Sequence, residues 1–153
     1  MEFILSHLID FIDQYYHQKR ILKKLKKLKL EIIFDIGAHK GEFSKSILNI
    51  KTTKKIYAFE ASHINFLQLK KKLKSIISRV EIFLINNGVS EKEGFKNIKQ
   101  TDESSSSTYS DINEFSKYFK KKKFFFYGKK KYFTNYETKL ITLNNFFYQN
   151  KLK

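Results

Sequence analysis

Residues Glu31–Phe43 read EIIFDIGAHKGEF, and this stretch decides the fold. Its apolar residues do not alternate with polar ones, which predicts a strand buried on both faces: Ile32, Ile33, Phe34 and Ile36. Gly37 ends the strand, Gly41 follows, and a helical pattern begins at Phe43. Two glycines between a strand and a helix let the backbone bend sharply and let a ligand approach the free N–H groups of the helix.

Two carboxylates accompany this turn. Asp35 lies one residue before Gly37, at the carboxyl end of the strand, where open α/β sheets bind ligands. Glu60 ends the next apolar run, Ile56–Glu60, and follows Gly41 by about the 20 residues that separate a glycine turn from a ribose-binding acid. Glu60 is therefore expected to accept the hydroxyls of a ribose.

The rest of the first 90 residues continues as alternating strands and helices. A short helix is expected after Phe43, and a longer one after its cap Ser62 with its buried side formed by Phe66, Leu67, Leu69, Leu73, Ile76 and Ile77. A third strand is expected over residues 80–86. This β-α-β-α-β order predicts an α/β fold with a parallel sheet. Beyond Ser90, Gly94 and the serine run at 104–107 indicate turns and loop.

The spacing of the glycines separates this turn from other nucleotide-binding turns. His39 stands where the dinucleotide fingerprint G-x-G-x-x-G has its second glycine, which disfavours a pyrophosphate. No Gly-Lys-Ser/Thr follows, so the turn is not a P-loop. A carboxylate for sugar hydroxyls beside a turn without pyrophosphate contacts indicates an adenosine-bearing ligand without phosphates, such as S-adenosylmethionine.

Four segments in this order resemble the FkbM family of S-adenosylmethionine-dependent methyltransferases: FDIGAHKGEFS from Phe34, IYAFEA from Ile56, NNGVS from Asn86 with Gly94, and LITLNNF from Leu140. The last is similar to the family's TLDDF segment, with Asn144 and Asn145 in place of its acids. The resemblance covers roughly residues 30–147. It implies a Rossmann-like class I methyltransferase fold with helices on both faces of a parallel sheet.

The resemblance also implies roles for single residues. Gly37 and Gly41, with Ala38 between them, would form the turn against the methionine moiety. Asp35 would orient that turn or the methionine end, or else only anchor backbone N–H groups. Further cofactor contacts would come from Glu60 at the ribose, with Ala61 beside it, and from Asn86 or Asn87 at the adenine. The family is associated with O-methylation of small molecules and sugars, and no catalytic residue is implied here.

Composition adds limits to this interpretation. The chain of 153 residues is about one domain, and it has no cysteine for disulfides or thiolate metal sites. Its four histidines have no metal-ligand spacing. No stretch approaches the ~20 apolar residues of a membrane span, and the N-terminus does not resemble a signal peptide, so a cytoplasmic location is expected.

The net charge is +16. It has two interpretations: binding to nucleic acid or anionic lipid, or a codon bias toward lysine on solvated faces. Lys and Arg number 31, and only Arg20 and Arg79 are arginines. Because phosphate readers favour the planar fork of Arg, we favour the second and expect no specific nucleic-acid partner.

The first and last parts of the chain lie outside the central pattern. Residues 1–29 are expected to form a basic amphipathic helical segment that covers one face of the sheet, with an anionic membrane surface as the alternative. Residues 30–153 would be the cofactor-binding domain. Residues 115–133, in which aromatics alternate with lysines, would be an insertion, with base stacking as the alternative. A strand is expected over 138–143, with Asn144 capping a short helix.

The sequence departs from the family pattern after this helix. Family members continue into a strand similar to KIDVEG, which pairs with the first strand. Without such a partner, Ile32–Ile36 would be an uncovered apolar edge, which folded proteins avoid. We therefore expect a domain that is incomplete in its C-terminal half and is completed by another chain or an oligomer. The alternatives are an inactive methyltransferase-fold interaction module and a basic RNA-binding protein or RNA methyltransferase.

Overall fold

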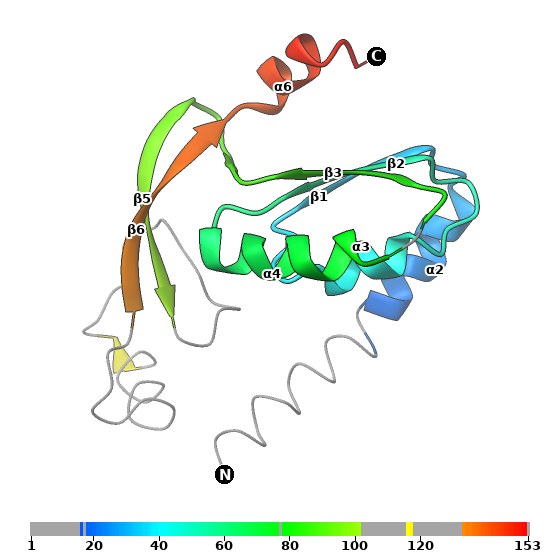
Figure 1. The fold of residues 1–153 in the computed structure, drawn as a ribbon, viewed down its shortest axis with the longest axis horizontal. Helices are drawn as coiled ribbons and strands as arrows, with labels where there is room; N and C mark the ends of the chain where they lie inside the picture. Colours follow the sequence, from blue (N-terminus) through cyan, green and yellow to red (C-terminus); the bar gives the residue numbers. More distant parts are fainter. Residues whose placement is uncertain (1–15, 17, 77, 102–115, 118–132, 153) are drawn as a thin grey trace.

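The computed structural model describes residues 16, 18–76, 78–101, 116–117 and 133–152 (Figure 1). In chain order the elements are α2 (Lys19–Lys27), β1 (Ile32–Ile36), α3 (Glu42–Ile47), β2 (Lys55–Phe59), α4 (His63–Lys74), β3 (Glu81–Ile85), β4 (Gly88–Val89), β5 (Gly94–Thr101), β6 (Phe133–Ile141) and α6 (Leu143–Gln149). Residues 1–15 and 17 of the expected 1–29 helical segment, and most of the expected 115–133 insertion, lie outside the described residues.

Sheet A, formed by β1, β2 and β3, is parallel, as the β-α-β-α-β pattern predicts. Its strands pair in register, so that Phe34, Tyr57 and Phe83 lie side by side. Among the described residues the order is β1-β2-β3, which leaves β1 at one edge. Figure 1 shows α3 and α4 on one side of this sheet and α6 on the other. The chain thus has the predicted α/β architecture with helices on both faces.

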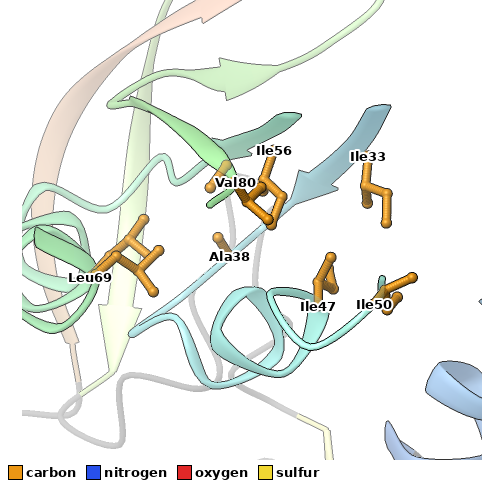
Figure 2. Packing of buried hydrophobic residues seen from close by; sticks show 9 residues of the cluster. Ile33, Ala38, Ile47, Ile50, Ile56, Leu69 and Val80 are labelled. Atoms are coloured by element: carbon orange, nitrogen blue, oxygen red, sulfur yellow. The ribbon is translucent and has the colours of Figure 1, made fainter. Parts of the chain in front are cut away.

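The main hydrophobic core lies between sheet A and helices α3 and α4 (Figure 2). The strands contribute side chains from alternate positions, because successive side chains of a strand point to opposite faces. The buried members are Ile33, Ala38, Ile47, Ile50, Ile56, Ala58, Leu69, Leu73 and Val80. Leu22 and Leu25 of α2 pack against this cluster. The described part of the basic helix therefore packs against the same core as α3 and α4.

The opposite face of sheet A carries a ladder of aromatic rings. Tyr57 stacks on Phe34 with ring centroids 5.0 Å apart and on Phe83 at 4.6 Å. Phe146 and Phe147 of α6 meet this ladder edge-on, and Phe147 lies 5.0 Å from Phe34. Edge-to-face packing of this kind is a favoured arrangement of aromatic side chains. It is how α6 is attached to the sheet.

The prediction that β1 is buried on both faces is wrong. Ile33 and Asp35 are buried on the helix side, whereas Ile32 is 38% exposed and Ile36 is 52% exposed. β2, the middle strand, is the one buried on both faces from Ile56 to Phe59. The reason is position in the sheet: α6 covers Phe34 and the middle strand, and the edge strand keeps its ends open.

A second sheet was missed by the sequence pattern. Sheet B has the order β4-β6-β5, with β4 parallel and β5 antiparallel to β6. The expectation of loop after Gly94 is therefore wrong, because residues Gly94–Thr101 pair along their whole length with β6. The expected strand at 138–143 exists as Phe133–Ile141, which begins earlier and ends before Thr142. We call the antiparallel pair of β5 and β6 the β5–β6 hairpin. Figure 1 shows it at one end of sheet A, with its strands running across the direction of the sheet A strands.

The N-terminal cap of α4 is the expected residue, whereas that of α6 is not. Ser62 caps α4, since its side chain accepts a hydrogen bond from the Asn65 N–H. Thr142, and not Asn144, caps α6 by accepting from the Asn145 N–H. Leu67, expected on the buried side of α4, is 52% exposed. No helix of the described residues is long and apolar enough to cross a membrane.

Candidate functional site

The candidate site lies where the carboxyl ends of the three parallel strands meet. The turn after β1, the loop after β2 and the end of β3 come together there and bring Asp35, Glu60 and Asn86 to one edge of sheet A. This is the edge at which open parallel sheets bind ligands. The three residues were predicted as site residues from positions far apart in the sequence.

The turn after β1 is fastened to the end of β2. The N–H groups of Gly37 and Ala38 both donate to the carbonyl of Phe59 at 2.9 Å, and the Gly41 N–H closes the turn on the Ala38 carbonyl at 2.8 Å. Gly37 has φ +80°, and a Cβ built there would meet nothing within 4 Å. The backbone at Gly37 therefore faces open space. The Ala38 side chain is buried in the core.

Gly41 has a different reason to be glycine. It is the N-cap of α3 with φ +86°, a conformation that glycine adopts without steric cost. A Cβ there would lie 2.7 Å from Leu69 Cδ1 and close to Leu73. Gly41 thus lets α4 pack closely against the start of α3. The two glycines of the turn serve two needs, and only Gly37 borders open space.

The Glu60 carboxylate joins two segments of the site. Its Oε2 accepts from the His39 N–H at 2.7 Å, and its Oε1 accepts from the Ser62 N–H at 2.8 Å. Glu60 is buried, so these bonds form in a medium of low dielectric. Each carboxylate oxygen has two acceptor positions, and these two hydrogen bonds use one on each oxygen.

Asp35 is held from the first turn of α3. Its Oδ2 accepts a hydrogen bond from the Ser44 hydroxyl at 2.5 Å, and both residues are buried. The sequence had left open a role for Asp35 as an anchor of backbone N–H groups, whereas its partner in the structure is the Ser44 hydroxyl. Burial raises the pKa of Asp35, and the charge of Glu60 adds to the rise while the Ser44 hydrogen bond opposes it. Two carboxylates therefore repel each other at this edge.

The two asparagines after β3 point to different partners. Asn86 donates from Nδ2 to the Glu60 carbonyl at 2.8 Å, and its Oδ1 accepts from Nδ1 of His63 at 2.8 Å. Asn87 instead directs its amide toward the Lys139 carbonyl on β6, at 3.5 Å. Of the two, Asn86 belongs to the cluster around Glu60. His63, at the start of α4, joins this cluster although the sequence did not single it out for the site.

Sheet B contributes further residues that the sequence did not identify. Thr138 donates to the Ala61 carbonyl at 2.9 Å, and the Gln100 side-chain oxygen accepts from the Tyr136 hydroxyl at 2.6 Å and from the Ser62 hydroxyl. Burial raises the pKa of Tyr136, the neighbouring Ser62 hydroxyl opposes this rise, and the charge of Glu60 adds to it. No local signal marks these residues, because the β5–β6 pairing brings them to the loop after β2.

Other features of the described residues lie away from this site. A groove of about 460 Å³ follows the helix-facing side of β3 and is lined mainly by apolar residues, including Phe66, Leu73, Val80, Ile82 and Leu84. It does not include the glycine turn or Glu60. Within the described part of the chain, no group of three or more His, Cys, Asp or Glu residues is arranged to hold a metal ion.

Comparison with known proteins gives a distant structural likeness. No protein-family profile matches the chain, and no curated protein matches it significantly. Among solved structures, the methyltransferase domain of bacterial CtHen1-C is similar, with 19% identity and a TM-score of 0.41. The likeness covers 47% of this chain and 40% of that chain, so the matched part spans less than half of that domain. The α/β fold is thus distantly similar to a methyltransferase domain.

Proposed function

We propose that this chain binds S-adenosylmethionine at the carboxyl ends of β1, β2 and β3. One observation carries the proposal: the hydrogen bond between Glu60 and His39 holds a buried carboxylate directly beside a glycine turn whose Gly37 faces open space. A carboxylate with free acceptor positions suits ribose hydroxyls. An open glycine backbone lets the rest of the ligand approach the turn.

The charge of the site supports this ligand over a phosphate. Asp35 and Glu60 are both buried carboxylates, and the charge of Glu60 raises the pKa of Asp35. A phosphate would add a third negative group to this edge. The sulfonium and ammonium groups of S-adenosylmethionine would instead relieve the repulsion, because opposite charges within a few ångströms favour the ionised form of a carboxylate.

The residues present fit this cofactor in distinct roles. Glu60 would accept the ribose hydroxyls through its remaining acceptor positions, Gly37 would face the methionine moiety, and Asn86 would border the adenine. Asp35 would hold the turn in place through Ser44. Gly41, Ala38 and Ala61 would shape the backbone of the site. Bound S-adenosylmethionine supplies a methyl group on an activated sulfonium, so the protein needs chiefly to align the acceptor with that methyl group.

We further propose that the activity is of the FkbM type, with a hydroxyl of a small molecule or sugar as acceptor. The support is the order of the four sequence segments, of which the first two, together with Asn86 at the start of the third, form this edge of sheet A. A direct assay would incubate the chain with S-adenosylmethionine and a panel of sugars and small alcohols and follow S-adenosylhomocysteine. Formation of this product only with an acceptor supports methyl transfer.

The edge of β1 belongs to the same proposal. Among the described residues β1 has no strand partner on its outer side, and Ile36 at its end is 52% exposed. We propose that a strand of another chain or of a second copy pairs there, because unpaired apolar edges associate. Light scattering should then show a mass above the monomer that falls in the Ile36→Lys variant. A monomeric wild type at all concentrations would overturn pairing with a second copy and leave a strand of another chain as the proposed partner.

The cofactor proposal is tested by calorimetric titration with S-adenosylhomocysteine, using two glycine variants. Gly37 and Gly94 both have positive φ, and a Cβ on either meets nothing within 4 Å, but only Gly37 lies in the site. Gly37→Val is expected to weaken binding by about tenfold or more, and Gly94→Val should bind like the wild type. A folded wild type that does not bind would overturn the proposal and favour an inactive interaction module.

A further inference from the structure

The β5–β6 hairpin is connected to the candidate site by buried polar side chains. Gln100 of β5 accepts two hydrogen bonds at its side-chain oxygen, one from the Tyr136 hydroxyl at 2.6 Å and one from the Ser62 hydroxyl. Gln100 is 6% exposed and Ser62 is fully buried. Buried polar groups that lose their partners destabilise a structure, so such a network favours a single arrangement.

The network continues from Ser62 to the glycine turn. The Ser62 N–H donates to Glu60 Oε1, and Glu60 Oε2 accepts from the His39 N–H. Tyr136, on the last described strand, is thus linked through Gln100, Ser62 and Glu60 to the turn after β1. Every contact in this series is a hydrogen bond between described residues.

Gln100 also determines the orientation of the Ser62 hydroxyl. A serine hydroxyl has one proton to donate and lone pairs with which it accepts. Because Ser62 donates its proton to Gln100, its lone pairs are left for the Asn65 N–H that it caps at 3.2 Å. On the other side of the loop, the Thr138 hydroxyl holds the Ala61 carbonyl at 2.9 Å. The hairpin therefore holds the loop of residues 60–62 at two points.

We propose that Gln100 and Tyr136 are positioning residues of the cofactor site, which hold the Glu60 carboxylate where it accepts the ligand's hydroxyls. This inference rests on the proposed function, since it assigns Glu60 a ligand. It extends that function to a hairpin that the sequence pattern did not connect with the site. Ligand affinity should then depend on a tyrosine that reaches the site only through other side chains.

The matched test uses two tyrosine variants. Tyr136→Phe removes the hydroxyl and keeps the ring, and Tyr148→Phe makes the same change on an exposed residue of α6. We expect Tyr136→Phe to weaken S-adenosylhomocysteine binding by about 3- to 10-fold, the range expected for a lost hydrogen bond. Tyr148→Phe should leave the affinity unchanged. Gln100→Met, which removes the acceptor for both hydroxyls, should weaken binding further.

A second measurement, made without ligand, distinguishes a role of Tyr136 in positioning Glu60 from a general loss of stability of the fold. Amide hydrogen exchange at His39 reports the bond to Glu60, and exchange at Ile56 in the middle strand reports the stability of sheet A. If Tyr136 acts through Glu60, Tyr136→Phe speeds exchange at His39 relative to Ile56. A purely structural role would change both amides together, because both would then exchange through the same unfolding.

The outcomes distinguish this inference from the proposed function. If the wild type binds S-adenosylhomocysteine and Tyr136→Phe leaves both the affinity and the His39 exchange unchanged, the positioning role is overturned and the cofactor site stands. If the wild type does not bind, the proposed function fails. The positioning role is then decided by the His39 amide alone, and exchange equal to that of Tyr148→Phe overturns it.

Discussion

The carboxylate of Glu60 accepts a hydrogen bond from the backbone N–H of His39 at 2.7 Å, although the two residues are 21 positions apart in the sequence. His39 has φ +52°, a left-handed conformation that is uncommon outside glycine. The bond therefore stabilises a turn that local preferences disfavour. The structure thus gives the backbone N–H of His39 a defined part in the site.

Replacing Glu60 by glutamine is expected to destabilise the fold. Both carboxylate oxygens accept backbone N–H groups, and the NH₂ of glutamine would face one of these donors. An unpaired buried donor costs about 1–3 kcal/mol. Urea unfolding should show this loss for Glu60→Gln and almost none for Glu81→Gln, whose side chain is 60% exposed. Equal stability of the two variants would contradict the hydrogen bonds from the His39 and Ser62 N–H groups to Glu60.

The two glycines of the turn should respond differently to alanine. Gly41→Ala places a Cβ 2.7 Å from the buried Leu69 and strains φ, so the expected loss of stability is about 2–4 kcal/mol. Gly37→Ala adds only the strain, about 1–2 kcal/mol. Thermal unfolding of both variants checks the difference. A larger loss of stability for Gly37→Ala than for Gly41→Ala would mean that the space beside Gly37, where a Cβ meets no atom within 4 Å, is filled.

Asp35→Asn should change how stability depends on pH. The pKa of Asp35 is raised by burial, so the folded state binds its proton more tightly than the unfolded state. Its favourable contribution is present below the ordinary pKa of 3.8 and is lost as pH rises through the folded-state pKa. Asparagine cannot titrate, and its oxygen still accepts from Ser44.

The stability of Asp35→Asn relative to the wild type should therefore rise with pH from 3.8 upward, by about 1.4 kcal/mol for each unit by which the pKa is raised. Urea titrations at several pH values would measure it. Glu31→Gln serves as the control, because Glu31 is 61% exposed. A pH-independent difference for Asp35→Asn would show that burial does not raise the pKa of this carboxyl.

The attachment of α6 is tested by two aromatic residues on the same helix. Phe146 contacts the rings of Phe34, Tyr57 and Phe59, whereas Tyr148 is 86% exposed. Phe146→Ala should cost about 2–3 kcal/mol, less than a fully buried phenylalanine because Phe146 is half-buried. Tyr148→Ala should stay within about 0.5 kcal/mol of the wild type. Equal effects in chemical denaturation would contradict edge-on packing of α6.

Local patterns account for the first part of the fold. Apolar runs of five residues separated by helical periodicity predicted the three parallel strands, and Ser62 was recognised as the cap of α4. The same patterns predicted that Asp35 and Glu60 would lie together, because the carboxyl ends of neighbouring parallel strands lie at one edge. Asn86 was expected there only from the family resemblance. These signals are short in range, so they can be read from the sequence.

Other features depend on contacts between distant residues. β5 has only Ile98 buried among apolar side chains, and its strand conformation comes from pairing with β6 more than 30 residues later. The exposure of Ile36 depends on the place of β1 in the sheet. The role of Gly41 depends on Leu69. None of these is encoded in neighbouring residues.

The sequence by itself determined that the chain contains parallel strands with carboxylates at their ends and a glycine turn from the first strand into a helix. Only the tertiary structure decided that Glu60 binds the backbone of two loops and that Gln100 and Tyr136 support it from a second sheet. The physical reason is the range of the interactions. Propensity and periodicity act within a few residues, whereas hydrogen bonds between loops form only once the sheets have brought distant backbone groups within 3 Å of each other.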